Sequence, residues 1–590
     1  MALTRTLLFA SLALHAFADL VVPPKADLAT LGPVYQAAKN SSFKAFEDAA
    51  AKATEAINKI IATGNSTFGP FDTETTSFSL QVFNTFDAKP LYEFHFEAPG
   101  LNGSYTKGKL SEDTIYRSGS LGKLMTVYTF LVDIGDDIFT DPVTKYIPEL
   151  ASAPFINPIL STNWSEVTIG ALASQLSGIG RDYLSIETWG QPSVDEIVAV
   201  GYPEIDHSNF PPCNFYGPQP SCTREQTLQG IVNHPPAFKS YSTPAYSNLA
   251  YLLLGLVYEQ ITGRTIDEGQ TDVFHNKLGA TSSYPRPPTS EVDAVIPYND
   301  SFALFTYDLG LLSPAGGQYV TTKDLRTWGQ AILKSTHLPR ALTGRWLKPR
   351  SFTSQWASAV GAPFEIYRLE IPSNEIINAG RIVDTYCKQG DVGQYSTYFG
   401  LAPDLEIGVS VMAAGVSPNR QVPPVRDTVI ELFYQAADAA AKEQASQAFR
   451  GTFKSNDANS SITLTVDDGP GVAVTGWISN GVDFLANDLF SAYSSFRLFP
   501  TKLTYDDAGI TYFAYRLEVS RFNGEPVTGD WWSEFNDLWL QVDNYIYANL
   551  ATDAFIIGFD ASGLVQSVAS QALRTTMHRA EIGQGQHIRN

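Results

Sequence analysis

Cysteine, methionine and positive charge are scarce in this chain. Its 590 residues include three Cys, four Met and only 40 Lys and Arg, against 61 Asp and Glu, which gives a net charge of −21. A surface this acidic repels nucleic acid and anionic membranes, so neither is expected as a partner. No collagen-like or low-complexity tract is present and 44% of the residues are hydrophobic, so the composition is globular, and the length indicates about two to four domains.

The signatures of two common hydrolase classes are also absent. An α/β-hydrolase needs a Gly-x-Ser-x-Gly elbow and a zinc protease needs His-Glu-x-x-His, and the sequence contains neither. No group of Cys and His residues has the spacing of metal ligands. We therefore expect no metal and no other cofactor.

Apolar runs long enough to span a bilayer are missing as well. The run at residues 7–17 follows Arg5 and includes the small-x-small sequence Ala16-Phe17-Ala18 at its end. This pattern predicts a signal peptide over residues 1–18, a mature chain that starts at Asp19, and an extracellular location. A buried N-terminal helix is the alternative interpretation.

Secretion changes how the three cysteines are interpreted. Cys213 and Cys222 lie in a Pro-rich loop and are close enough in sequence to close a small disulfide ring, whereas Cys387 is left over as an apolar filler rather than a reactive thiol. Six Asn-x-Ser/Thr sequons predict exposed glycosylation sites on a eukaryotic secretory route. They lie at Asn40, Asn65, Asn102, Asn163, Asn299 and Asn459.

Hydrophobic periodicity predicts the order of the elements. Helical spacing predicts helices at residues 34–62, 116–134, 169–176, 246–262, 322–334 and 425–441. Alternating or continuous apolar runs predict strands at residues 78–83, 91–96, 382–388, 396–401 and 407–413. Strands at both ends of a helical region predict an α+β domain over residues 66–445, preceded by an N-terminal segment over 19–65 that carries the first, amphipathic helix.

Two regions depart from this pattern. Residues 201–236 are rich in proline with little periodicity, which is typical of a lid or binding wall; a surface insertion is the alternative. Residues 446–590 consist of short alternating runs separated by turn signals, which predicts an all-β barrel or sandwich. Its strands are expected near residues 461–466, 471–477, 496–505, 512–519, 538–547 and 554–559.

Three short motifs carry reactive groups. Ser120 and Lys123 are three residues apart, so on a helix they share a face and the amine can reach the hydroxyl. Tyr246-Ser-Asn248 opens a predicted helix, and a tyrosine near a lysine ionises more easily and can act as a base. Lys388-Gln-Gly390 ends a predicted strand, where glycine lets a substrate approach the backbone. Each pattern alone is weak, because others match it, at Ser41–Lys44, Ser104–Lys107, Tyr547–Asn549 and Lys277–Gly279.

As an ordered set, the three motifs resemble the serine β-lactamase-like superfamily, in its branch of class C β-lactamases, D-alanyl-D-alanine carboxypeptidases and esterases. The similarity covers about residues 70–440 and extends to the segments 116–123, 167–178, 238–255 and 316–325. The resemblance implies a β-lactamase/transpeptidase-like catalytic domain, an antiparallel sheet flanked by helices. With the predicted signal peptide and sequons, it indicates a secreted eukaryotic member, of fungal type.

The resemblance also implies a mechanism through a covalent serine ester. Ser120 would attack a carbonyl, and Lys123 and Tyr246 would share its proton, with the choice of base left open. The ammonium of Lys388 would lower the pKa of both groups. The remaining implied positions bind substrate: Asn248 holds its amide or ester, and the backbone N–H groups of Ser120 and Asp391, beside Gly390, form the oxyanion hole.

One departure from the family is plain. The third motif is Lys-Gln-Gly where the family usually has Lys-Thr-Gly or His-x-Gly, and the missing hydroxyl argues against recognition of a β-lactam carboxylate. Three hypotheses remain: a secreted serine hydrolase acting on a small ester, amide or D-peptide, an acyltransferase of secondary metabolism on the same scaffold, or a catalytically silent binding protein. The C-terminal β region resembles barrel modules appended to family peptidases, whose role could be to wall the site, to dimerise or to be structural only.

Overall fold

The computed structural model describes residues 31–39, 41–182, 194–204, 213, 221–289, 291–298, 303–371, 381–488, 490, 493, 495–520 and 542–580. The predicted signal peptide and the sequons at Asn40 and Asn299 lie outside these residues. The other four sequon asparagines, Asn65, Asn102, Asn163 and Asn459, are exposed. Among the described residues, no helix has both the length and the apolar character that crossing a membrane requires.

Two compact units make up the chain. The larger comprises Asn40–Leu369 and Val383–Tyr434, and the smaller comprises Met1–Lys39, Glu370–Ile382 and Gln435–Asn590. The expected domain boundary near residue 445 falls inside helix α13 (Pro418–Phe449), whose residues belong partly to one unit and partly to the other.

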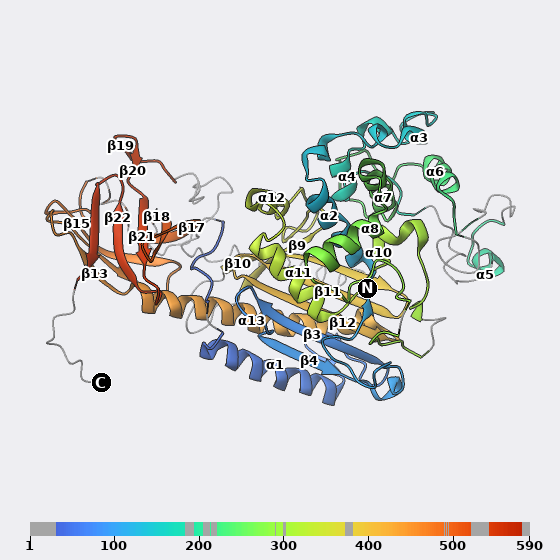
Figure 1. Ribbon diagram of the computed structural model, residues 1–590, viewed down its shortest axis with the longest axis horizontal. Coiled ribbons are helices and arrows are strands. Elements are labelled where there is room, and N and C mark those ends of the chain that lie inside the picture. Colours follow the sequence, from blue (N-terminus) through green and yellow to red (C-terminus); the bar gives the residue numbers. More distant parts are fainter. Residues whose placement is uncertain are drawn as a thin grey trace, which may run out of the picture. The chain divides into compact units, whose positions relative to one another are not determined.

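A sheet of eight strands, in the order β4-β3-β12-β11-β10-β9-β8-β7, forms the centre of the larger unit (Figure 1). All of the predicted strands of this region are present and pair antiparallel with their neighbours. The strands are β3 (Thr76–Asn84), β4 (Tyr92–Phe96), β7 (Ser351–Phe352), β8 (Ser358–Val360), β9 (Glu365–Ile371), β10 (Arg381–Val392), β11 (Tyr395–Ala402) and β12 (Ile407–Gly415).

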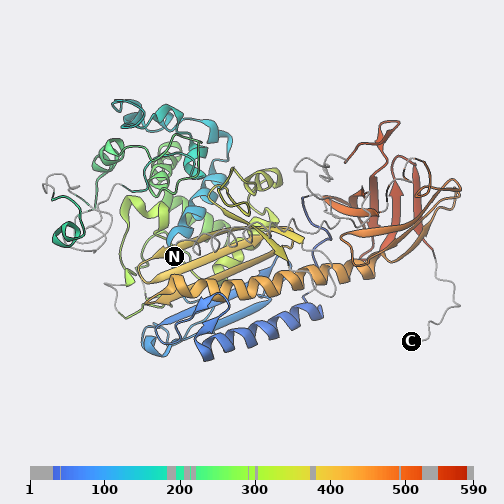
Figure 2. The same ribbon diagram turned by 180° about the vertical axis from the view of Figure 1, so that it is seen from behind.

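Helices cover both faces of this sheet, so its central strands are buried on both sides, although β3 alternates apolar and polar residues along its sequence. Every residue of β3, β11 and β12 is buried. On one face, Trp328 of α11 (Thr322–Lys334) stacks on Phe399 of β11 with ring centroids 5.1 Å apart. On the other, Phe433 of α13 packs against Tyr92 of β4, on the side where α1 (Lys44–Thr63) also lies (Figure 2).

The boundaries of several predicted helices change in the structure. The predicted helix 116–134 begins only at Gly122, as α2 (Gly122–Asp133), because Tyr116–Arg117 form strand β5 against β6 (Tyr319–Val320) and Gly119 adopts a left-handed conformation, with φ +53°. The predicted helix 246–262 begins at α7 (Leu249–Thr262), so the Tyr246 motif lies at its approach. Helix α11 has the predicted bounds, α1 starts later than predicted, α4 (Ile169–Ala173) ends earlier, and α13 extends beyond its predicted ends.

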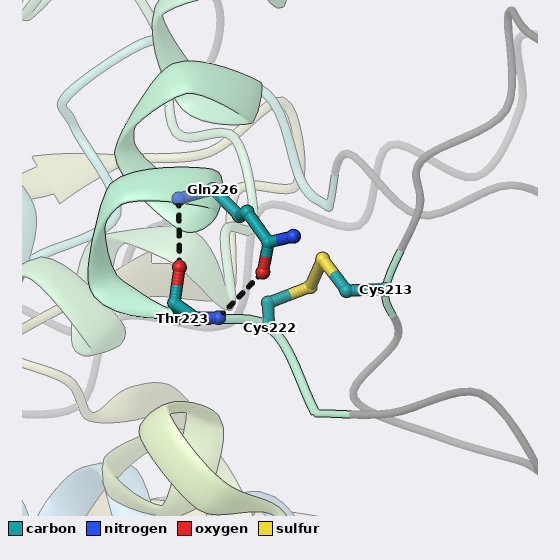
Figure 3. Close-up of a disulfide and its surroundings, with 4 residues drawn as sticks. All are labelled: Cys213, Cys222, Thr223 and Gln226. Carbon is teal, nitrogen blue, oxygen red and sulfur yellow. Dashed lines mark hydrogen bonds between the residues drawn. A yellow bond between two sulfur atoms is a disulfide. The ribbon is translucent and has the colours of Figure 1, made fainter.

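The Pro-rich region 201–236 contains a helix that its composition did not predict. Helix α6 (Arg224–Asn233) begins at a capping box, in which Thr223 accepts from the backbone of Gln226 and Gln226 accepts from the backbone of Thr223 (Figure 3). The adjacent Cys222 forms the predicted disulfide with Cys213, with Cα atoms 4.8 Å apart. The disulfide therefore holds Cys213 beside the start of α6.

The remaining helices and small pairings of the described residues complete the larger unit. The remaining α-helices are α3 (Pro148–Ala151), α5 (Val194–Ala199), α8 (Ile266–Thr271), α10 (Ser313–Gly316) and α12 (Arg340–Trp346), and short 3₁₀ and π-helical turns lie between them. A two-residue pair, β1 (Asn65–Ser66) with β2 (Gly69–Pro70), follows α1, whose end at Gly64 is as predicted.

The smaller unit is a closed antiparallel barrel, as predicted. Its strands run in the order β14-β13-β23-β22-β21-β18-β17-β15, and β14 also pairs with β15, which closes the ring. Buried aromatic and aliphatic side chains, among them Phe453, Trp477 and Phe555, fill its core. The strands are β13 (Gly451–Lys454), β14 (Ser461–Thr465), β15 (Val472–Ser479), β17 (Ser495–Asp507), β18 (Ile510–Ser520), β21 (Ala554–Phe559), β22 (Val565–Ser570) and β23 (Thr575–Arg579), with short additions at β16 (Val482–Asp483), β19 (Ile546–Tyr547) and β20 (Leu550–Ala551).

Candidate active site

Ser120 lies on a single 3₁₀ turn (Gly119–Leu121) immediately before α2. Two groups donate hydrogen bonds to its Oγ: the phenol of Tyr246 at 2.6 Å and the Nζ of Lys123 at 3.0 Å. The residue is half-buried, so it is not sealed away from solvent. Ser120 therefore has the contacts and the access that a nucleophile needs.

Lys123 occupies the first turn of α2 and is completely buried. Its Nζ also donates to Asn248 Oδ1 at 2.7 Å and to the carbonyl oxygen of Ala315 at 2.7 Å. Burial lowers the pKa of Lys123, and the nearby charge of Lys388 lowers it further. A neutral lysine amine next to a serine hydroxyl can accept its proton.

Tyr246 is surrounded by cations. Lys123 Nζ lies 4.8 Å, Lys388 Nζ 5.4 Å and the Arg181 guanidinium carbon 4.6 Å from the centre of its ring. Burial alone would raise the pKa of Tyr246, but the positive charges of Lys123 and Lys388 outweigh burial and lower it below its usual value. Tyr246 is therefore a second candidate for the base.

Lys388 lies on β10 with only 3% of its side chain exposed. It forms an ion pair with Glu365, the first residue of β9, and donates to the Gln389 carbonyl oxygen at 2.7 Å. Burial lowers the pKa of Lys388, but the Glu365 carboxylate more than compensates, so the net pKa is raised and the ammonium stays charged.

Two glycines bring the backbone of β10 against the serine turn. A Cβ added to Gly390 would lie 2.7 Å from the backbone nitrogen of Ser120, and one added to Gly119 would lie 2.6 Å from the backbone nitrogen of Asp391. Neither contact is possible for a real side chain, so only glycine fits at both positions. The backbones at Ser120 and Asp391 therefore lie in close approach.

Asn248 is held between a cation and an anion. Its Oδ1 accepts from Lys123, and its Nδ2 donates to both carboxylate oxygens of Asp182, at 3.1 and 3.0 Å. Desolvation raises the pKa of Asp182. The amide thereby orients the Lys123 amine toward Ser120, and its donor group is occupied by the protein itself.

All of the predicted site residues lie around one point, Ser120, whereas the competing matches do not. Lys277, for example, forms ion pairs with Asp133 at 2.7 Å and Asp272 at 3.2 Å, and Tyr547 is exposed in the smaller unit. Among the residues that the structure describes, no group of His, Cys, Asp and Glu could hold a metal. Cys387 is buried and unbridged and donates to the Glu365 carbonyl oxygen at 3.0 Å, and burial raises the pKa of its thiol.

Three residues at the site were not anticipated from the sequence: Glu365, Asp182 and Arg181. Arg181 and Asp182 lie three and four residues beyond the segment 167–178 that carries the family resemblance, so their position was a usable signal. Glu365 had none, because its partner Lys388 is 23 residues away on a different strand.

The comparisons with known proteins agree with this geometry. The β-lactamase family model matches residues 77–432, and a model described as the C-terminal domain of β-lactamase-like proteins matches residues 441–581. A "Beta-lactamase-like protein" of Arthroderma benhamiae is 26% identical over 534 residues, covering 84% of this chain and 86% of that protein.

Two further fungal relatives have similar coverage. "Probable hydrolase M10" of a Phoma species is 25% identical and "Probable hydrolase clz13" of Cochliobolus lunatus is 25% identical, and each covers 73% of this chain and about seven-tenths of its own length (70% and 71%). A solved structure of a D-stereospecific amidohydrolase from a Streptomyces species has a TM-score of 0.45 at 17% identity, covering 65% of this chain and 97% of that one. With its eight-stranded sheet, its Ser120-centred cluster and a family model that matches residues 77–432, this chain belongs to the β-lactamase family.

Proposed function

We propose that this chain is a secreted serine hydrolase that acts on a small ester, amide or D-peptide through an acyl-enzyme at Ser120. The observation that carries the proposal is the convergence of Lys123 Nζ and Tyr246 OH on Ser120 Oγ, at 3.0 and 2.6 Å. Two proton carriers with lowered pKa values at one hydroxyl are the arrangement that activates a serine. Two fungal relatives are each named a probable hydrolase, which favours hydrolysis as the outcome.

In the first step, Ser120 Oγ bonds to the substrate carbonyl carbon while Lys123 or Tyr246 takes its proton. The carbonyl oxygen becomes an oxyanion between the backbone N–H groups of Ser120 and Asp391, each worth roughly 3–4 kcal/mol. The bond to the leaving group then breaks, and the same base returns its proton to the leaving oxygen or nitrogen. Water attacks the resulting ester in the same way, releases the acid and restores the Ser120 hydroxyl.

Labelling with a fluorophosphonate tests this function. The secreted protein should gain the mass of the probe on Ser120, the variant Ser120→Ala should gain none, and the parent should turn over a chromogenic aryl ester. If the parent forms no serine adduct, the catalytic proposal fails. Adding an amine acceptor to the ester reaction distinguishes the acyltransferase, which would form the amide faster than the acid.

A further inference from the structure

The ammonium of Lys388 is already neutralised by a carboxylate of the chain. Its Nζ donates to Glu365 Oε1 and to the Gln389 carbonyl oxygen, and Glu365 Oε2 accepts from the Gln389 backbone nitrogen at 3.0 Å. One carboxylate therefore binds both the side chain and the strand of the third motif. An ammonium has three donors, and two of them here are directed at oxygens of the protein.

The exposed fractions of the Lys388 and Glu365 side chains determine which of the two charges an approaching ligand contacts. Only 3% of the Lys388 side chain is exposed, against 29% of the Glu365 side chain. A substrate carboxylate directed at Lys388 would reach the Glu365 carboxylate first, and like charges brought together without water between them repel strongly. A neutral or cationic group meets no such penalty.

We propose that Glu365 is a specificity-determining residue, which makes the Lys388 side of the site accept acyl donors that are neutral or cationic there and reject those that carry a carboxylate. The inference rests on the proposed hydrolase function and names its substrate class. Lys388, 5.4 Å from the Tyr246 ring, then acts on the base rather than on the substrate.

Arg181 is a second cation near Tyr246 and could bind a substrate carboxylate in place of Lys388. Arg181 has 65% of its side chain exposed and its guanidinium lies over the Tyr246 ring, while its nearest carboxylate contact, to Asp182 Oδ2, is long at 3.7 Å. If substrates of this protein carry a carboxylate, Arg181 is the group that would bind it. The variant Arg181→Gln separates that possibility from the proposal.

A matched pair of aryl esters provides the measurement. Both have the same acyl group, and the phenol leaving group carries a carboxylate in one and a carboxamide in the other. For the parent, kcat/KM should be at least tenfold higher for the carboxamide ester. In Glu365→Gln this ratio should fall at least tenfold, and Glu365→Asp should retain most of the discrimination. Glu370→Gln, an exposed carboxylate on the same strand β9, should keep the parent ratio.

Equal rates of the two esters with the parent, or a preference for the carboxylate ester that Arg181→Gln abolishes, would overturn the inference while leaving the hydrolase intact. A parent without turnover and without a serine adduct would instead refute the hydrolase. In that case calorimetric titration of Ser120→Ala with the two esters decides: tighter binding of the carboxamide ester supports the role of Glu365, and equal binding overturns it.

Discussion

At the scale of single residues, some side chains of the site contact the Ser120 hydroxyl, and others set the pKa of those contacting groups. Lys123 and Tyr246 touch the serine hydroxyl, whereas Lys388 and Asp182 act on them without touching it. Lys388 lowers the pKa of both contacting groups, and Asp182 raises that of Lys123. Variants of each kind should therefore have different kinetic signatures.

Removing either proton carrier should abolish most of the activity. Lys123→Ala and Tyr246→Phe each remove a group that bonds to Ser120 Oγ, and general acid–base groups typically contribute about 10²–10⁴-fold to the rate. Ester turnover should fall by this amount while thermal unfolding shows a folded protein. Parent-like turnover in either variant would show that the other group alone moves the proton.

Removing the charge of Lys388 should move the pH profile upward. Because the ammonium favours the ionised phenol and the neutral lysine, its loss in Lys388→Met raises the pKa of Tyr246 and of Lys123. Less base is then present at a given pH, so the rising limb of kcat/KM shifts to higher pH. Lys323→Met, which removes an exposed lysine paired with Asp113, is the control and should leave the limb in place.

Asp182→Asn should have the opposite effect on the pH profile. Loss of the carboxylate lowers the pKa of Lys123 and loosens the amide of Asn248 that orients it. We expect the rising limb to move to lower pH, and kcat to fall about 10–100-fold at nearly constant KM because the amine is misplaced. A residue that serves only stability would leave the limb unmoved, and that result would contradict the positioning role.

At the scale of elements, the site depends on how closely β10 approaches the turn before α2. The approach is possible only because Gly390 and Gly119 lack side chains. Strand β10 thereby brings the backbone at Gly390 and Asp391 against the turn that carries Ser120, with Lys388 two residues away on the same strand.

A single methyl group should disrupt this approach. In Gly390→Ala the new Cβ would collide with the backbone of Ser118 and lie 2.7 Å from that of Ser120, so β10 or the serine turn must shift. We expect a loss of activity of about 100-fold or more, together with a lower unfolding temperature. Gly344→Ala is the matched control: it lies in helix α12 with no atom within 4 Å of the added Cβ, and should stabilise the protein by about 0.5–1 kcal/mol. Equal effects of the two changes would contradict the close approach.

At the scale of the whole molecule, two predictions test whether the chain is secreted. A chain secreted by a fungal host should begin at Asp19, and enzymatic removal of N-glycans should reduce its mass. Asn65, Asn102, Asn163 and Asn459 are exposed in the structure and are the sites where peptide mass spectrometry should find the glycans. A secreted protein whose mass does not change on deglycosylation would contradict this prediction.

Much of the architecture could be predicted from periodicity, because the buried strands β3, β11 and β12 and the helix α11 have strong local patterns. The prediction failed where tertiary pairing outweighed a local helical pattern, and where a local helix-start signal was not used. Tyr116 and Arg117 pair with β6, so they form a strand although their apolar pattern predicts a helix. The Thr223 capping box is a helix signal in the sequence, but it lies in a Pro-rich region for which no helix was predicted.

The reactive groups of the site could likewise be named from their motifs, but not the residues that set their charge. Glu365 and Asp182 meet Lys388 and Asn248 only through the tertiary fold, over separations of 23 and 66 residues. No spacing rule connects strand β9 with β10, and only the nearness of Asp182 to the family segment 167–178 pointed toward that residue. Residues that tune a site from another element leave no periodic trace in a single sequence.

The burial of Cys387 has a consequence for how the protein can be produced. Its thiol is completely enclosed on β10, one residue before Lys388, while the native bond joins Cys213 to Cys222. If the chain folds under oxidising conditions, any bond that captured Cys387 would hold β10 out of the sheet and leave Ser120 without the contact of its turn with Gly390. Productive maturation therefore requires that β10 be packed before the thiols are oxidised, or that a wrong bond be reshuffled afterwards.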